Sequence, residues 1–166
     1  MGTRGKIYIH NDGEEDSILG VVWSRFDSNP QFLGAEVIAD FCASKPLRSM
    51  MTIGGEKCFL GMGDFALQFC SLLVSYRYPK IGGEMGNLPN MRKDKRWTSP
   101  TTSNYFLIDV EDARESYAPY EYHIYPDLEN ESFLIEITCN YEQDEDEENV
   151  EGIYSPEEVI AKFAIR

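Results

Sequence analysis

The chain of 166 residues is long enough for one domain with a single hydrophobic core, and its 42% hydrophobic content excludes a disordered chain. Its formal charge of −14 excludes general nucleic-acid or anionic-membrane binding, because a negative field repels phosphates. No apolar run reaches the roughly 20 residues of a membrane-spanning helix, so we expect a cytoplasmic protein with no membrane partner.

The first elements that the sequence predicts are two strands, over residues 6–10 and 18–26. Ile7 and Ile9 alternate onto one face, and the Asn-Asp-Gly turn signal at 11–13 indicates a hairpin. The second strand is apolar on both faces. We therefore expect either a central strand that is covered on both sides, or a strand with one face used for binding.

Two helices should follow. Asn29-Pro30 is typical of an N-cap followed by proline at the first helical position, and this helix should run to about Ala43. A short strand is predicted at 50–53 and a second helix after Asp64, its expected cap. The apolar stripes of the two helices have helical spacing: Leu33, Val37, Ile38, Phe41; Phe65, Phe69, Leu72, Leu73, Tyr76.

The second half alternates loops and strands. Residues 77–103, which are basic and rich in glycine and proline, are expected to form a long loop. Strands are expected at 104–110, 120–125 and 132–141, with short connections that favour an antiparallel meander. An acidic loop, 142–151, leads to a capping box at Ser155-Pro156-Glu157-Glu158 and a short final helix.

These elements predict a single α+β domain over residues 1–166, with a mainly antiparallel sheet of about five strands. Two to three helices should pack on the sheet. The cysteines Cys42, Cys58, Cys70 and Cys139 form no C-x-x-C pair, and only two histidines accompany them. We therefore expect reduced thiols, no metal and no cofactor.

The negative charge is concentrated in the second half of the chain. Residues 98–166 carry 3 Lys/Arg and 18 Asp/Glu, whereas residues 1–97 carry 12 and 11. Such a surface attracts basic proteins. The expected partner-binding residues are those at the centre of the acidic loop: Asp144, Glu145, Asp146, Glu147 and Glu148. The alternative is a solubilising loop, because runs of carboxylates are common.

A second group of candidates could bind a small ligand. Trp23 and Arg25 share one face of the second strand, where the indole could stack a ring and the guanidinium could hold a phosphate. Other candidate ligand-binding residues are Asp27, Asn29, Arg92 and Arg96. In the alternative interpretation Trp23 is a core residue, Arg25 and Asp27 form a surface pair, and Asn29 only caps the helix.

Catalysis has little support in the sequence. No nucleophile elbow, phosphate-binding loop or zinc-protease motif occurs. His10, at a strand end, and His123, on an outward strand face, are interpreted as ordinary surface residues. We therefore predict that the protein is not an enzyme.

The opening MGTRGKIYI, a hairpin, and then W-x-x-F-D-S-N-P…L-G together resemble a family of small tailed-bacteriophage proteins. Members begin with MGTR followed by G or S and an alternating strand, and carry an aromatic-aspartate-x-x-Pro motif ahead of a helix. The matching residues here are Met1 to Arg4, Trp23, Asp27, Pro30, Leu33 and Gly34. The resemblance implies a non-enzymatic phage accessory protein made in the host bacterial cytoplasm.

The leading hypothesis is a phage-encoded inhibitor of a host defence system. It would occlude a host protein that has a basic surface and bind no nucleic acid directly. One alternative is a nucleotide sponge, in which Trp23 and Arg25, with Arg92 or Arg96, hold a cyclic or modified nucleotide signal, with a homodimer left open. The other is a metal-dependent nuclease or phosphodiesterase.

Overall fold

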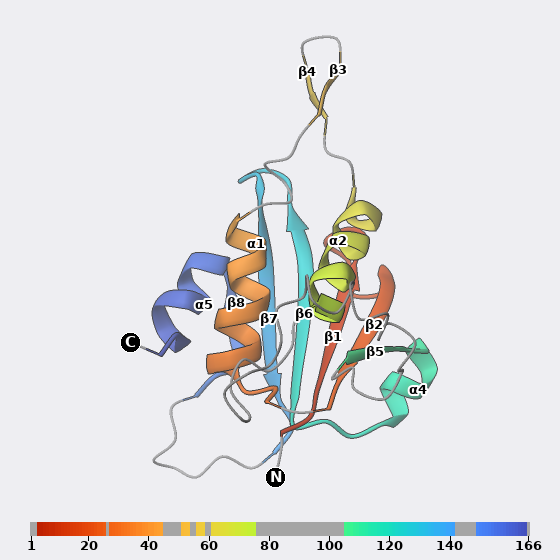
Figure 1. Ribbon diagram of the computed structural model, residues 1–166, viewed down its shortest axis with the longest axis vertical. Coiled ribbons are helices and arrows are strands. Elements are labelled where there is room, and N and C mark those ends of the chain that lie inside the picture. The colour runs from red at the N-terminus through yellow and green to blue at the C-terminus, as the bar shows by residue number, and fades with distance from the viewer. Residues whose placement is uncertain are drawn as a thin grey trace, which may run out of the picture.

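The computed structural model describes residues 3–25, 27–44, 51–53, 56–58, 61–75, 105–141 and 149–165. It confirms the α+β class and shows a six-stranded, mostly antiparallel sheet of order β5-β2-β1-β6-β7-β8 (Figure 1). The strands of this sheet are β1 (Gly5–His10), β2 (Ile18–Ser24), β5 (Tyr105–Ile108), β6 (Tyr120–Asp127), β7 (Ser132–Cys139) and β8 (Gly152–Tyr154). The sheet thus has one strand more than the sequence predicts.

The centre of the sheet is a parallel pair of strands. β1 lies beside β6 with Ile7 opposite Tyr122, and every other pairing in the sheet is antiparallel. The predicted β1–β2 hairpin is confirmed, with a register shift between Ile9 and His10. The predicted meander is confirmed only for β6 and β7, because β5 pairs with β2 at one edge of the sheet.

Three helical segments cover one face of the sheet (Figure 1). They are a π-helix, η1 (Pro30–Ala39), that continues as α1 (Asp40–Ser44), then α2 (Met62–Ser75) and α5 (Pro156–Phe163). The fully buried side chains between helices and sheet include Ile7, Ile9, Tyr122, Ile124, Ile135, Leu33, Ile38, Phe65, Phe69 and Val159. The described residues of the predicted apolar stripes therefore lie in the core or, like Leu72, pack against it, as removal of apolar surface from water requires; Tyr76 lies outside the described residues.

Local capping signals fix two of the helix starts. The Asn29 side chain accepts a hydrogen bond from the Phe32 N–H at 2.8 Å, and Ser155 with Glu158 forms the predicted capping box of α5. The predicted cap at Asp64 is wrong. Because α2 already begins at Met62, Asp64 lies in its first turn and accepts a hydrogen bond from the Gln68 side chain at 2.7 Å.

On the opposite face of the sheet the described residues include one short helix, α4 (Val110–Glu115). The sequence predicts that strand 104–110 runs through Val110. Instead Asp109 accepts a hydrogen bond from the Glu111 N–H at 2.8 Å, which ends β5 and starts the helix. Ala113 of α4 packs against Tyr8 and Val21. This packing covers Tyr8 and Val21 on the second side of the sheet.

A separate hairpin, β3 (Met51–Ile53) and β4 (Glu56–Cys58), extends away from the sheet (Figure 1). It confirms the predicted strand at 50–53 and adds a partner strand that was not predicted. Within the described ranges, every helix is too short or too polar to cross a lipid bilayer. The basic loop 77–103 and residues 142–148 of the acidic loop lie outside the described residues.

Candidate functional site

The side chains that carry chemistry gather on the face opposite the three helices. Adjacent residues of paired strands point to the same side of a sheet. Lys6, Tyr8 and His10 therefore share this face with their partners on β2 and β6, among them Trp23 and His123. Two clefts open there, and the α4 segment contributes a residue to each.

The first, the arginine cleft, has a volume of about 440 Å³ and is lined by Arg4, Trp23, Arg25, Phe106, Ile108 and Ser116. The second, the histidine cleft, has a volume of about 550 Å³, and its lining includes Tyr8, Glu15, Arg114, His123, Tyr125 and Glu136. Volumes in this range are typical of small-ligand sites.

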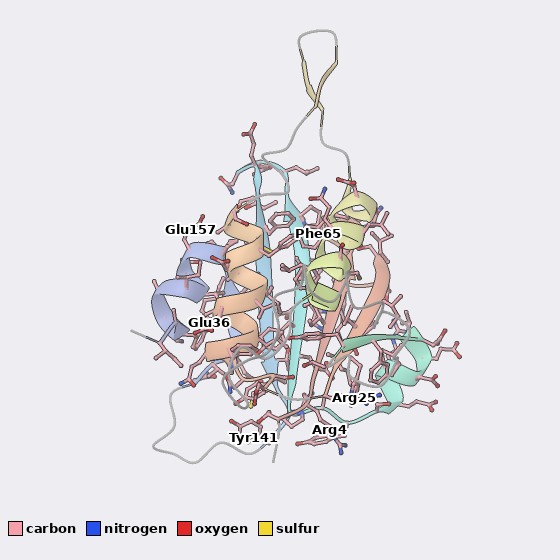
Figure 2. The ribbon with its side chains drawn as sticks, viewed as in Figure 1. Arg4, Arg25, Glu36, Phe65, Tyr141 and Glu157 are labelled. Atoms are coloured by element: carbon pink, nitrogen blue, oxygen red, sulfur yellow. The ribbon has the colours of Figure 1, made fainter. Side chains whose placement is uncertain are left out.

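The arginine cleft brings together the predicted pair Trp23 and Arg25 and adds two residues that sequence reasoning missed. The Arg25 guanidinium carbon lies 5.0 Å from the centre of the Phe106 ring, and the Trp23 and Phe106 rings lie 6.4 Å apart. Arg4 joins them because β1 begins where β2 ends, with Gly5 paired to Ser24. Figure 2 shows Arg4 and Arg25 at this end of the sheet.

The two guanidiniums of this cleft have no carboxylate partner among the described residues. The surface pair of Arg25 with Asp27, one of the alternatives that the sequence leaves open, is not formed. Both arginines are exposed and Trp23 is only half-buried, so this indole is not a core residue. Two like charges that share an aromatic hollow repel each other, and a bound anion would relieve that repulsion.

The other predicted ligand residues lie elsewhere. Asp27 adopts a left-handed backbone conformation, φ 52°, in the turn between β2 and η1. The next residue, Ser28, donates its N–H to the Thr3 carbonyl at 3.0 Å, and its own carbonyl accepts the Tyr122 hydroxyl at 2.7 Å. Asn29 caps η1. The remaining candidates lie outside the described residues: Arg92, Arg96, Asp144, Glu145, Asp146, Glu147 and Glu148.

The sequence interpretation assigned no role to the two histidines: His123 lines the histidine cleft, and His10 is buried next to it. The prediction that His10 is an ordinary surface residue is wrong, since its exposed fraction is 0%. The Tyr8 ring stacks on His123 at 4.3 Å, and the His10 ring stacks on Tyr125 at 4.1 Å. The parallel pairing of β1 with β6 aligns these rings across the two strands.

Hydrogen bonds determine the tautomers of both histidines. His10 Nδ1 lies 3.2 Å from the Glu14 carbonyl oxygen, which can only accept, so Nδ1 carries the proton. In neutral His10 the Nε2 atom is then an acceptor, and it accepts the proton that His123 Nδ1 donates at 2.8 Å. Neutral His123 is therefore left with a lone pair on Nε2.

Burial keeps both rings neutral at pH 7. It lowers the pKa of His123 to about 4, with a further contribution from the neighbouring His10. Burial also lowers the pKa of His10. For Tyr8, burial raises the hydroxyl pKa to about 12, so this group remains protonated.

Two carboxylates beside the rings differ in their partners. Glu121 accepts a hydrogen bond from the nearly buried Lys6 ammonium at 2.7 Å, which neutralises its charge locally. Among the described residues, Glu136 accepts a hydrogen bond only from the neutral Tyr125 hydroxyl, at 3.1 Å. Burial, and next the charge of Glu136, raises the Tyr125 pKa, so the hydroxyl remains a donor. No cation of the described residues therefore compensates the charge of Glu136.

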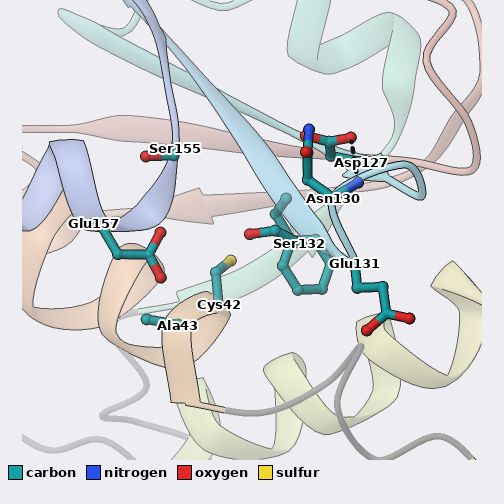
Figure 3. A pocket seen from close by; sticks show the side chains of 9 residues that line it. Cys42, Ala43, Asp127, Asn130, Glu131, Ser132, Ser155 and Glu157 are labelled. Carbon is teal, nitrogen blue, oxygen red and sulfur yellow. Dashed lines mark hydrogen bonds between the residues drawn. The ribbon is translucent and has the colours of Figure 1, made fainter.

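A third hollow is lined by residues of α1, α5 and the β6–β7 turn (Figure 3). Its polar side chains have roles in the fold itself, so we do not interpret it as a ligand site. Burial raises the pKa of the Cys42 thiol, which keeps it from acting as a thiolate. Ser155 is engaged in the α5 cap, and Asp127 accepts a hydrogen bond from the Asn130 side chain at 2.7 Å. In the described part of the chain, no three potential metal ligands come together.

One sequence signal could have indicated the histidine cleft. On β1, Lys6, Tyr8 and His10 alternate with the two core isoleucines, and on β6 Glu121 and His123 alternate with core residues in the same way. Alternation assigns each of these two sets to a face of its own strand, but the pairing of the two strands is not local. Comparison of the chain with protein-family models, with curated proteins and with solved structures finds no match, so the function must be argued from the site itself.

Proposed function

We propose that this protein is a non-enzymatic binding protein that holds a nucleotide in the arginine cleft. The observation that carries the proposal is the pair of guanidiniums, Arg4 and Arg25, which have no described carboxylate partner and flank two aromatic rings. Guanidiniums bind phosphate through charge-assisted hydrogen bonds, and aromatic rings stack on bases. A nucleotide supplies both groups on one molecule.

The overall charge makes this cleft selective for a small anion. The chain carries a formal charge of −14, so a long polyanion would be repelled over most of the surface. A mononucleotide or cyclic dinucleotide would meet only the cationic hollow. In the setting that the phage resemblance implies, the bound nucleotide would be a defence signal, and the protein would act by sequestering it.

A second candidate function is occlusion of a basic host protein by the acidic loop. It is favoured by the concentration of charge in residues 98–166, which carry 18 Asp/Glu against 3 Lys/Arg. The residues proposed for this function differ from those that line the arginine cleft, so separate variants can test the two functions.

Isothermal titration calorimetry with a panel of mononucleotides and cyclic nucleotides tests the nucleotide proposal. We expect saturable binding by at least one nucleotide. Trp23→Ala should weaken it about 5- to 150-fold, because base stacking contributes about 1–3 kcal/mol. Arg25→Gln should weaken binding by a similar factor. The control is Arg114→Gln, which removes one positive charge outside the arginine cleft and should leave the affinity unchanged.

Two results would overturn the proposal. One is the absence of both binding heat and a thermal shift with every nucleotide of the panel. The other is equal weakening by Arg25→Gln and Arg114→Gln, which would show a general charge effect rather than a site. Chromatography of each nucleotide after incubation tests the non-enzymatic part, since conversion to product would contradict it.

A further inference from the structure

We propose that the histidine cleft is a separate binding site for an arginine side chain of a basic protein partner. This site does not depend on the nucleotide proposal, because the arginine cleft and the histidine cleft share no lining residue. Four features of the histidine cleft support a guanidinium as its occupant: the lone pair of one histidine, the excess of carboxylates, the stacked rings and the apolar rim.

The first feature is the hydrogen-bond polarity of the ring that lines the cleft. The bonds from His10 to the Glu14 carbonyl and from His123 to His10 leave His123 Nε2 as an acceptor. No described residue donates to this atom. An anion offers only acceptors and would be disfavoured there, whereas an N–H group of a guanidinium can donate to it.

The second feature is the balance of charge around the opening. Glu15 and Glu136 face the cleft, and neither is paired with a cation among the described residues. Arg114 also lines the cleft, but its guanidinium lies 3.6 Å from the Asp16 carboxylate. The local charge is therefore negative, which attracts a cation and repels a phosphate.

The third feature is a rigid aromatic platform. The Tyr8 and His123 rings are parallel within 2°, and His123 is parallel to Tyr125 within 12°. Planar guanidiniums stack on such rings more readily than ammonium groups do, and they donate several hydrogen bonds in a fixed fork. This geometry favours arginine over lysine.

The fourth feature is the apolar rim of the cleft. Leu134 and Ile153, on β7 and β8, line the cleft with exposed fractions of 36% and 62%. The methylene groups of a long side chain, or the backbone around it, can cover these residues when the charged end is bound. A free small cation would leave this apolar surface uncovered, so we favour a side chain on a protein partner.

The test is an NMR titration of the full chain with a blocked hexapeptide, Gly-Arg repeated three times, and with its citrulline counterpart. Citrulline keeps the length and most donors of arginine but lacks the charge. We expect saturable shifts of the His123 and Tyr125 resonances with the arginine peptide. The citrulline peptide should bind at least tenfold more weakly.

Variants locate the site. Glu136→Gln keeps an acceptor for the Tyr125 hydroxyl and should weaken binding of the arginine peptide about fivefold or more. Glu15→Gln, in the exposed hairpin loop, should weaken it without any effect on folding. The matched control is Glu129→Gln, in the exposed β6–β7 turn outside the cleft, which should leave the affinity unchanged.

Three results would overturn the proposal: no saturable shift with the arginine peptide, equal binding of the citrulline peptide, or equal weakening by Glu15→Gln and Glu129→Gln. The last result would indicate attraction to the net charge of the protein. Addition of a nucleotide that occupies the arginine cleft should not displace the peptide. Failure of the nucleotide proposal would leave the peptide result unaffected.

Discussion

The histidine pair should make the stability of the fold depend on pH between about pH 7 and pH 5. The pKa of His123 is about 4 in the folded protein, whereas an unfolded histidine titrates near 6.5. As the pH falls below 6.5, the unfolded chain binds the proton first. The free energy of unfolding therefore decreases through this window and levels off below about pH 4.

The size of the effect follows from the two pKa values. A group that titrates at about 4 when folded and at about 6.5 when unfolded lowers the free energy of unfolding by about 2 kcal/mol between pH 7 and pH 5. His10, whose pKa is also lowered, changes stability in the same direction. The chain has only 2 histidines, and most carboxylates remain ionised at pH 5. The two histidines should therefore account for most of the change in unfolding free energy between pH 7 and pH 5.

Urea unfolding at pH 7, 6 and 5 measures the effect. In His123→Gln the amide can still donate to His10 Nε2, but the titrating ring is gone, so the decrease should fall to the contribution of His10 alone. Equal unfolding free energies of the wild type at pH 7 and pH 5 would refute the reasoning. So would a His123 resonance that titrates near pH 6.5, because the pKa of His123 would then be the same in the folded and the unfolded chain.

Three further predictions concern other parts of the chain. Asn29→Ala should lower the free energy of unfolding by about 1 kcal/mol, measured in urea, while Asn29→Asp should keep the cap. Gly5→Ala should lower the free energy of unfolding by about 1–3 kcal/mol, because the added Cβ would lie 2.5 Å from Ser28 Cβ. The control is Gly13→Ala, because the space around Gly13 is open. Replacement of the five acidic residues 144–148 by Asn or Gln should weaken binding to a basic partner and make the affinity less dependent on salt concentration. Unchanged affinity would rule out partner binding by the acidic loop.

The sequence by itself predicted the elements whose signals are local. Asn29 and Ser155 cap helices because a side-chain oxygen needs only a backbone N–H three residues away. Phe133, Ile135 and Ile137 reach the core because alternation along one strand assigns its faces. The same rule gave a wrong prediction at Val110. Apolar alternation continues to this residue, but the Asp109 cap ends the strand and starts a helix.

Only the tertiary structure decided which strands far apart in the sequence are neighbours. His10 and His123 are 113 residues apart in the chain, and they meet because β1 and β6 pair in parallel. Likewise Arg4 reaches Arg25 only through the register of β1 with β2. Alternation shows which side of a strand is buried, but register and neighbour depend on how all the elements pack together. Both clefts are built across strands, so neither could be derived from any single stretch of the chain.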